Sequence, residues 1–496
     1  MKRYLFLLAA VACLAACDSG TTEEQGPLKV IILQMNDVYE IAPLEGGESG
    51  GLARVATLKK QLEAEAPVIS VLSGDFLSPS LLGTLRVDGK KIAGMQMVET
   101  LNALGLDYVT FGNHEFDLDQ EDLQVRIDSA DFTWISSNTF AFEEGKMQPF
   151  TQNGEPLPLA VVHPVAQGPK TFNLAFIGIC LPFNQEDFVR YTSYDSATQV
   201  ALASVQGQYQ VPLAITHLNW VEDTAYANRH PQFPLIMGGH DHEHMYKITK
   251  NGPVAKADAN AKTVYVHRLS YYPNGDSTHL ESELVYITDS IAEDSAVAQV
   301  VARWEEIGTK AINEMGYDPD KVVMETETPL DGREATIRNE PTNLGRLSTA
   351  AVMDQFAGLD LVLLNSGSIR LDDQLIGKIT MYDILRTFPY GGPMVTTSMK
   401  GSDLQEILKI GLETNVGMGG YLQTGNVSKA DDGSYLIGGE AIQPDKMYQV
   451  AVTSFMSGGG ESNLGMLRNY TYTTPNARTA AKNDIRDVVA TYMEGL

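Results

Sequence analysis

Positive charge is scarce in this sequence of 496 residues. Lysine and arginine together number 36, against 63 aspartates and glutamates, which gives a formal net charge of −27 at pH 7. Non-specific nucleic-acid binding needs a basic surface, so this balance argues against a nucleic-acid partner. A small anionic substrate stays compatible with it, because a few arginines and metal ions can dominate the local field. The remaining acidic charge fits a solvated surface that keeps the protein soluble.

Long apolar runs are also missing after the N-terminus, so no transmembrane helix is predicted there. The segment MKRYLFLLAAVACLAAC (1–17) has a basic start, an apolar run and small residues, which is typical of a secretory signal. Its ending LAAC resembles a bacterial lipobox, and the resemblance implies cleavage before Cys17 and lipidation of its thiol. The alternative is a plain signal peptide that happens to contain a cysteine. Residues 18–27, DSGTTEEQGP, are then predicted to form a polar tether.

Cysteine is also rare, with three residues in the whole chain. Cys13 leaves with the signal and Cys17 carries the lipid, so only Cys180 remains in the mature protein. This excludes an intramolecular disulfide. Cys180 lies in the apolar run FIGICLPF, which favours a buried and unreactive thiol.

The length and the pattern of the chain predict a layered α/β protein. A chain of 496 residues is too long for one hydrophobic core and suggests two domains, or three. β-Branched runs such as LKVIILQMND (28–37) alternate with helical periodicity such as LARVATLKKQLEAE (52–65). Alternation of this kind favours sheets covered by helices, where ligands bind beyond the carboxyl ends of strands.

Polar side chains follow five of those predicted strands, at six positions. The stretch GGHDHEH (238–244) alone holds three of the nine histidines, at every second position. A mixture of carboxylate, imidazole and amide groups suits divalent first-row metals such as Zn, Mn or Fe. Six coincidences at one edge favour a metal centre over six unrelated turn residues. The candidates are Asp37, Asp75, Asn113 with His114, His217, His240 and His242.

Six stretches carry a resemblance to a known family. NDVYE, GGLARVATL, LSGDFLSPS, VTFGNHEFD, ITHL and GGHDH resemble, in this order, the metallophosphatase domain of the bacterial and animal 5′-nucleotidase family. The resemblance implies a four-layer α/β/β/α sandwich over 28–289 and a centre of two divalent metal ions, Zn, Mn or similar. By position, Asp37, Asp75 and His242 would hold the first metal. The second would be held by Asp75, Asn113, His217 and His240.

The same resemblance assigns roles to neighbouring residues. Asp75 would bridge the two metals, and two metals about 3.5–4 Å apart can activate a water and clamp an in-line displacement at phosphorus. His114 would stabilise the transition state or protonate the leaving oxygen, with Asp117 orienting its ring. His244 matches no family ligand and is interpreted as a supporting or surface residue.

Tyr39 departs from the family pattern, which usually has Asp-x-His where this chain has Asp37-Val38-Tyr39. Three interpretations stay open. Tyr39 binds the first metal as a phenolate, which would favour a harder ion such as ferric iron. Alternatively, it is only a neighbour of a more open three-ligand site. In the third interpretation the first site is weak and the protein is a poor catalyst.

The second half of the chain resembles the C-terminal domain of the same family. A helical stretch over 290–320 is predicted to link the domains, and its apolar stripe is interpreted as packing. Residues 321–496 then contain LDGREATIRNEPTNLGRLSTAAVM, LVLLNSGSIR, GKITMYDILRTFPYGG and TSFMSGGGES, which carry the resemblance. The two-domain order is more specific than either half, because the metallophosphatase fold alone serves many substrates.

Six residues of this C-terminal domain are expected to bind the substrate. Arg338 and Arg370 match family arginines, and guanidinium groups suit phosphate oxygens. By resemblance two aromatic rings would sandwich the base, and stacking tolerates several bases. Glu461 stands where the family has a ribose-binding aspartate, which puts ribose recognition in doubt. The full set is Arg338, Asn365, Arg370, Tyr421, Phe455 and Glu461.

Together these observations predict a lipid-anchored, metal-dependent phosphohydrolase of the bacterial envelope that faces the periplasm. It would hydrolyse nucleoside 5′-monophosphates to nucleoside and phosphate. Alternatives of the same architecture are a 2′,3′-cyclic-nucleotide phosphodiesterase and a nucleotide-sugar hydrolase. A nucleotide-binding lipoprotein with an impaired metal site is a further alternative. The membrane would be contacted only through the lipid anchor, and the sequence does not define an oligomeric state.

Overall fold

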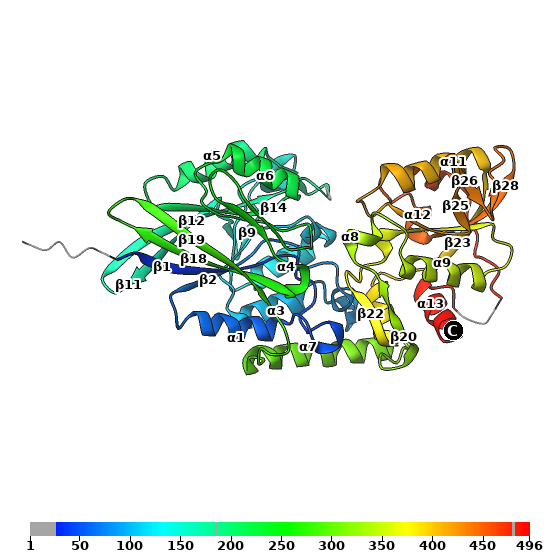
Figure 1. Ribbon diagram of the computed structural model, residues 1–496, viewed down its shortest axis with the longest axis horizontal. Coiled ribbons are helices and arrows are strands. Elements are labelled where there is room, and N and C mark those ends of the chain that lie inside the picture. Colours follow the sequence, from blue (N-terminus) through cyan, green and yellow to red (C-terminus); the bar gives the residue numbers. More distant parts are fainter. Residues whose placement is uncertain (1–25, 184–185, 479–481) are drawn as a thin grey trace, which may run out of the picture.

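The computed structural model describes residues 26–183, 186–478 and 482–496. The predicted signal sequence, the lipidation site Cys17 and nearly all of the tether lie outside these residues. Figure 1 shows two α/β domains side by side, the first coloured blue to green and the second yellow to red. They are connected along one edge by helix α7 (Ser295–Glu314). None of the helices in the described ranges combines the length and apolarity needed to cross a membrane.

The first domain contains two six-stranded sheets. The first sheet has the order β19-β18-β1-β2-β5-β6, in which β1, β2, β5 and β6 run parallel and β18 pairs antiparallel with β1. Its strands are β1 (Leu28–Met35), β2 (Val68–Leu72), β5 (Tyr108–Val109), β6 (Thr133–Trp134), β18 (Thr263–Tyr272) and β19 (Ser277–Tyr286). β-Branched, apolar runs form its central strands because parallel strands are covered on both faces.

The second sheet has the order β11-β12-β14-β15-β17-β16. Here β12, β14, β15 and β17 run parallel, while β11 and β16 pair antiparallel at the edges. The strands are β11 (Ala160–Gln167), β12 (Lys170–Cys180), β14 (Val211–His217), β15 (Ile236–Met237), β16 (Met245–Ile248) and β17 (Pro253–Lys256). Both sheets therefore have a parallel centre whose strand ends point the same way.

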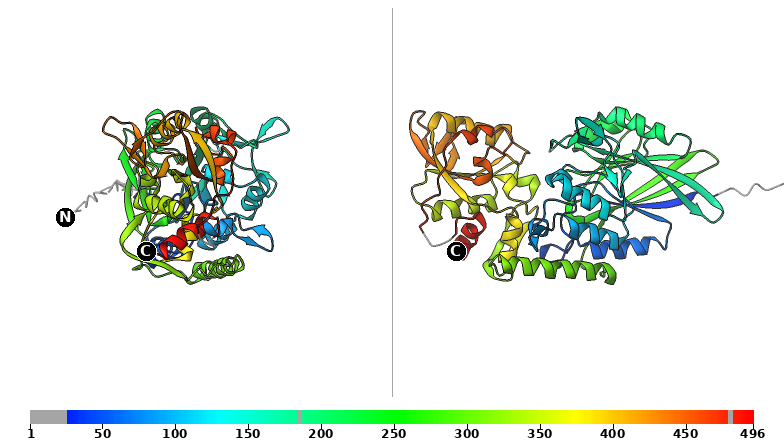
Figure 2. Two further views of the ribbon diagram at one scale, coloured as in Figure 1. Left: turned by 90° about the vertical axis from the view of Figure 1, so that its right-hand side faces the viewer. Right: turned by 180° about the vertical axis from the view of Figure 1, so that it is seen from behind.

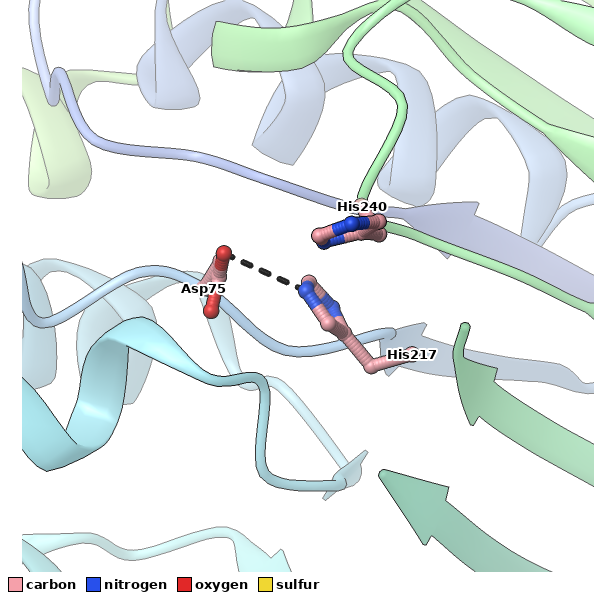
Figure 3. A group of neighbouring side chains, drawn as sticks. All are labelled: Asp75, His217 and His240. Carbon is pink, nitrogen blue, oxygen red and sulfur yellow. Dashed lines mark ion pairs between the residues drawn. The ribbon is translucent and has the colours of Figure 1, made fainter. Parts of the chain in front are cut away.

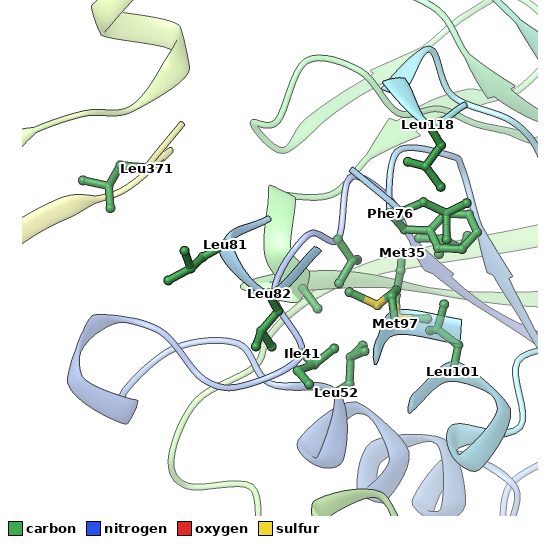
Figure 4. Packing of buried hydrophobic residues seen from close by; sticks show 14 of the residues in the cluster. Met35, Ile41, Leu52, Phe76, Leu81, Leu82, Met97, Leu101, Leu118 and Leu371 are labelled. Carbon is green, nitrogen blue, oxygen red and sulfur yellow. The ribbon is translucent and has the colours of Figure 1, made fainter. Parts of the chain in front are cut away.

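Helices cover the outer face of each sheet, which gives four layers. Helices α1 (Leu52–Leu62), α3 (Met95–Leu104) and α7 pack together against the first sheet, and α5 (Tyr194–Ser204) and α6 (Trp220–Arg229) cover the second. One apolar core, with Ile32 and Phe176, lies between the sheets. Another lies beneath the helices, where Figure 4 shows Met35, Met97 and Leu101 packed together. The predicted α/β/β/α sandwich is confirmed.

The second domain is built on a four-stranded sheet of order β23-β28-β21-β24. These strands are β21 (Leu361–Asn365), β23 (Met394–Lys400), β24 (Leu422–Gly425) and β28 (Met447–Thr453), with helices α9 (Asn343–Gln355), α11 (Gly401–Lys409) and α13 (Ile485–Met493) around them. A separate antiparallel pair, β20 (Val322–Asp331) with β22 (Gln374–Thr380), lies towards the first domain. This is the smaller α/β domain that the sequence predicts.

Helix α7 lies within the predicted linker range. Its first turn is capped by Asp294, whose carboxylate accepts hydrogen bonds from Ala296 N and Val297 N. Its buried stripe packs against α1 and α3, and a Cβ added to Gly308 would lie 2.4 Å from Leu82 Cδ2. By its packing, α7 is therefore part of the first domain. Figure 2 shows the helix from behind, along the same edge of the molecule.

Candidate metal centre and substrate cavity

The predicted metal ligands follow the carboxyl ends of parallel strands, as expected. Asp37 follows β1, Asp75 follows β2 and Asn113 follows β5, while His217 ends β14 and His240 and His242 follow β15. Four of these residues have a positive φ: 52° at Asp37, 55° at Asp75, 85° at His240 and 61° at His242. Residues other than glycine adopt this left-handed conformation at a cost, and such strain clusters at functional sites. The chain turns sharply at these points and directs the side chains inward.

These side chains form two overlapping groups. One atom each of Asp75, His217 and His240 lies within 4.8 Å of the others, and so do atoms of Asp37, Asp75 and His242. Asp75 belongs to both groups, which is the arrangement that a bridging carboxylate requires. Asn113 lies beside the first group, because its Oδ1 is 3.1 Å from His240 Nδ1. Figure 3 shows the rings of His217 and His240 turned towards Asp75.

The donor set fits a pair of divalent cations. His217 is fully buried, and its Nδ1 lies 2.7 Å from the carbonyl oxygen of Ser73, to which it donates. Its other nitrogen, Nε2, is buried without a hydrogen-bond partner among the described residues and lies 3.2 Å from Asp75 Oδ2. A buried imidazole nitrogen that makes no well-aligned hydrogen bond and is directed at carboxylates is suited to bind a cation. The residues present would therefore hold divalent metal.

The charges of these groups depend on one another. Burial opposes ionisation of Asp75, but His217 and His114 outweigh it and lower the pKa of Asp75 below its usual value. Burial likewise opposes protonation of His217, but Asp75 outweighs it and raises the pKa of His217 to about 9. A metal ion between these groups would replace the imidazole proton and keep the carboxylate ionised.

A buried carboxylate shapes the loop around Asp75. Glu115 is fully buried and accepts hydrogen bonds from the backbone N–H groups of Asp75, Phe76, Leu77 and Gly112. A Cβ added to Gly112 would lie 2.1 Å from Asp75 Oδ1, so this position requires glycine. Glu115 directly follows His114 in the sequence but is not among the predicted site residues. Its carboxylate joins the loops after β2 and β5.

Lys256 is a second buried supporting residue that the sequence analysis did not identify. Its Nζ donates to the carbonyl oxygens of Leu218 (2.5 Å) and Gly239 (2.7 Å) and forms ion pairs with Asp223 (2.9 Å) and Asp241. Leu218 and Gly239 directly adjoin His217 and His240. One ammonium group therefore joins the two loops that carry three histidine ligands.

Tyr39 lies inside the metal centre. Its side chain is buried, and its hydroxyl donates to Asp75 Oδ2 at 3.1 Å and lies 3.0 Å from His242 Nε2. Burial and the carboxylates of Asp75 and Asp37 raise the pKa of Tyr39 well above its usual value. The phenol thus lies beside the group formed by Asp37, Asp75 and His242, two of which it contacts.

His114 and Asp117 form a hydrogen-bonded pair beside the ligands. His114 Nδ1 lies 2.7 Å from Asp117 Oδ2, and the His114 backbone N–H donates to Asp75 Oδ1 at 2.7 Å. Burial disfavours the imidazolium form, but Asp117 and Asp75 outweigh it and raise the pKa of His114. The arrangement presents a protonated imidazole to the cavity. His244, in contrast, is exposed and hydrogen-bonded to Asp258, away from both ligand groups.

A cavity of about 630 Å³ connects the metal ligands with the second domain. Ligand candidates Asp75, Asn113, His240 and His242 form one part of its wall. Arg338 and Arg370 line the opposite part, and Glu334 forms an ion pair with Arg338. Asn365 and Glu461 line it as well, and Asn365 Nδ2 donates to Glu461 Oε2 at 2.7 Å. Five of the six predicted substrate-binding residues are therefore brought together at this cavity.

Tyr421 is the exception, and the structure corrects the expectation that it stacks a base. Its side chain is only 5% exposed and is not among the residues that line the cavity. The reason is its backbone: Tyr421 O accepts a hydrogen bond from Ser366 N, which extends the pairing of β24 with β21 and directs the ring into the protein. Glycines on both sides suggested an exposed loop, but strand pairing continues through this position.

Another tyrosine takes the position at the cavity. Tyr390, in FPYGG between α10 (Met381–Thr387) and β23, lines the cavity together with Phe455. Their side chains are 52% and 54% exposed. A Cβ added to Gly460 would lie 2.7 Å from Phe455 Cε2, so the glycine makes room for that ring. The pair of glycines after Tyr390 was the available sequence signal.

Comparisons with known proteins agree with this architecture. A family model described as the 5′-nucleotidase C-terminal domain matches residues 322–468. The chain is 25% identical over 516 aligned residues to a 5′-nucleotidase of Vibrio parahaemolyticus, with 91% of this chain and 88% of the relative covered. The crystal structure of a 5′-nucleotidase precursor from Thermus thermophilus matches with a TM-score of 0.74 at 19% identity, covering 94% of this chain and 96% of the other.

A third comparison shows that the fold alone does not define the substrate. The structure of the sulfate thiohydrolase SoxB of Thermus thermophilus, in complex with glycerol, matches with a TM-score of 0.69 at 15% identity, and 94% of each chain is covered. The chain has the two-domain fold of these proteins, and its strand ends carry two overlapping groups of side chains that could hold metal ions. Residues 322–468 match the 5′-nucleotidase C-terminal domain model, and the relative from Vibrio parahaemolyticus is named a 5′-nucleotidase.

Proposed function

We propose that this protein hydrolyses nucleoside 5′-monophosphates to nucleoside and phosphate. The observation that carries the proposal is the composition of the shared cavity. Two arginines and two exposed aromatic rings of the second domain face the metal ligands of the first. Arginines bind phosphate oxygens, and aromatic rings can stack on any of the nucleobases.

Each residue has a defined part in this reaction. Arg338 and Arg370 bind the phosphate, while Tyr390 and Phe455 hold the base. When bound, two divalent ions would activate the attacking water and neutralise charge that develops on the phosphate oxygens. His114, oriented by Asp117, donates a proton to the leaving ribose oxygen or stabilises its charge. Glu461, held by Asn365, is placed to accept hydrogen bonds from the ribose hydroxyls.

The test is phosphate release from AMP by the chain without its N-terminal segment, after chelation and then with added Mn²⁺, Zn²⁺, Co²⁺ or Fe²⁺. We expect release that depends on metal. Release only from 2′,3′-cyclic nucleotides or nucleotide sugars would shift the substrate within the same class. Absence of release from every one of these substrates would favour the nucleotide-binding lipoprotein instead.

Asp75→Asn tests the two-metal assignment directly. The amide keeps the size of the side chain but cannot bridge two cations as a charged ligand, so we expect activity to fall by about 10²-fold or more. Metal analysis of the purified variant should show less than the metal content of the wild type. Full activity with unchanged metal content would rule out a bridging Asp75.

We also propose that the mature chain is anchored in the bacterial envelope through lipidated Cys17 and faces the periplasm. The support is the basic, apolar and small-residue sequence that ends in LAAC. Cys17→Ser should move the protein from the membrane fraction to the soluble fraction. A variant that stays in the membrane fraction would contradict the anchor.

A further inference from the structure

His242 is held by side chains of both domains. Its Nε2 faces the metal centre, 3.0 Å from the Tyr39 hydroxyl and 3.6 Å from Asp37 Oδ1. Its Nδ1 lies 2.9 Å from Oδ2 of Asp372. Asp372 belongs to the second domain and lies between β21 and β22. A candidate metal ligand of one domain is thus oriented by a carboxylate of the other.

The carboxylate of Asp372 is fixed in position. Its backbone is left-handed, with φ of 45°, and its Oδ1 accepts a hydrogen bond from Glu334 N at 2.9 Å. Its carbonyl oxygen accepts a second contact across the domain boundary, from Lys262 Nζ at 3.4 Å. The cavity beside it measures only about 20 Å³, room for a single water molecule. Both side chains are largely buried, with exposed fractions of 7% for His242 and 14% for Asp372.

The chemistry of the contact sets the state of the imidazole. A carboxylate oxygen can only accept, so Nδ1 of His242 carries the proton and donates it to Asp372. Nε2 is then the nitrogen that faces the metal centre, where a bound cation would take the place of its proton. Among the described residues, the next carboxylate oxygen near Nδ1 is Glu334 Oε2 at 3.8 Å, beyond hydrogen-bond distance. Partners of this kind fix the tautomer of metal-binding histidines and raise metal affinity.

We propose that Asp372 is a positioning residue that prepares His242 for the first metal, so that metal binding and contact between the domains are thermodynamically linked. The first metal binds more tightly when the second domain is seated against the first. By linkage, the bound metal favours the seated arrangement to the same extent. The inference rests on the metal centre of the proposed function, but on no particular substrate.

The experiment compares Asp372→Asn with Asp372→Ala. Asparagine tolerates the left-handed backbone, and its amide oxygen can still accept from Glu334 N. Its amide nitrogen then faces Nδ1 and donates to it, which moves the imidazole proton to Nε2 and blocks metal binding there. Alanine leaves Nδ1 to solvent water and permits either tautomer. If Asp372 had only a structural role, Asp372→Ala would lower metal affinity more than Asp372→Asn does.

The readout is Mn²⁺ binding by titration calorimetry, without substrate, alongside thermal unfolding in chelator. We expect Asp372→Asn to weaken the first site by about 10–100-fold and Asp372→Ala to weaken it less. In thermal unfolding in chelator, we expect the opposite order, with Asp372→Asn more stable than Asp372→Ala. Asp331→Asn is the matched control, because Asp331 lies in the same domain and pairs with Arg333 rather than with His242. We expect it to bind Mn²⁺ as the wild type does.

Two results would overturn the proposal. One is unchanged Mn²⁺ affinity in Asp372→Asn, and the other is a larger loss of affinity in alanine than in asparagine. If Asp372→Asn does not fold, Asp372→Ala alone decides, since wild-type affinity in that variant would also contradict the proposal. Metal affinity is measured without phosphate release, so an incorrect substrate assignment leaves this result interpretable.

Discussion

At the scale of single residues, the surrounding structure favours the protonated form of His114. Asp117 holds its Nδ1 at 2.7 Å, and the pKa of His114 is raised above its usual value. A proton donor with a raised pKa stays protonated at higher pH. Activity that needs this proton is therefore present at low pH and is lost as pH rises through the raised pKa.

We expect Asp117→Asn to move the alkaline limb of the pH–rate profile to lower pH, because the carboxylate charge that favours the imidazolium is gone. His114→Asn should lower kcat by about 10²–10⁴-fold, the range found for loss of a general acid or base. Phosphate release measured across pH at saturating metal gives both the position of the alkaline limb and kcat. An unmoved alkaline limb in Asp117→Asn would show that the limb belongs to another group.

His267 gives a stability prediction at the same scale. It is fully buried on β18, where Nε2 donates to Gln34 Oε1 at 2.9 Å and Nδ1 accepts from Ser282 Oγ at 2.8 Å. Burial lowers the pKa of His267 to about 3. The native state thus keeps this ring neutral, whereas the unfolded chain protonates it below about pH 6.5. The stability it contributes is present above that pH and is lost as pH falls towards 3.

From pH 6.5 to pH 5 the unfolding free energy should lose about 2 kcal/mol through this group. His267→Gln removes the titration, so the stability difference between wild type and variant should shrink by that amount over the same interval. Denaturant unfolding in chelator, at several pH values, measures it. A difference that is constant with pH would contradict the neutral buried histidine.

At the scale of secondary-structure elements, the loops that follow the parallel strands carry the candidate metal ligands. Polar residues after apolar runs identify the side chains that the structure brings together as candidate metal ligands, because parallel strands end at one edge and both the run and its polar end can be read in the sequence. The same sequence pattern does not identify the supporting residues Glu115 and Lys256. Lys256 is 39 residues beyond His217 and ends an apolar strand, where nothing in the sequence marks it as an internal ion pair.

Lys256→Met tests the role of that ion pair. It leaves Asp223, which is fully buried, without its cation, and breaking a buried pair costs about 3–5 kcal/mol of unfolding free energy. Metal affinity should fall as well, since the loops of His217 and His240 lose their common partner. Lys247→Met on the neighbouring strand β16 is the control, because Lys247 is exposed. Equal stability of the two variants would show that Lys256 does not hold the loops.

At the scale of the whole molecule, the substrate cavity exists only where the two domains meet. Strand ends of the first domain supply the metal ligands, and loops of the second supply the arginines and the aromatic rings. The sequence predicts both sets through separate motifs. It does not predict their contacts, such as Asp372 with His242 across 130 residues of chain, and it selects Tyr421 where the structure selects Tyr390.

Tyr390→Ala and Phe455→Ala should each raise KM for a nucleoside monophosphate by about 5–150-fold, because base stacking contributes about 1–3 kcal/mol per ring. Hydrolysis of a phosphate ester without a base should change little. Tyr421→Leu, which removes a ring outside the cavity, should leave KM near the wild-type value. A large rise in KM for Tyr421→Leu, with none for Tyr390→Ala, would restore Tyr421 as the stacking residue.

The hydrogen bond between Asp372 and His242 limits how freely the two halves could be recombined. The cavity suggests a modular enzyme, in which exchanging the second domain for that of a relative would change the preferred nucleotide and leave the chemistry intact. Because Asp372 of the second domain is proposed to orient one ligand of the first metal, a chimera would keep full affinity for that metal only if the incoming domain carried a carboxylate at this position. Exchanging the second domain would therefore change both the nucleotide preference and the affinity for the first metal.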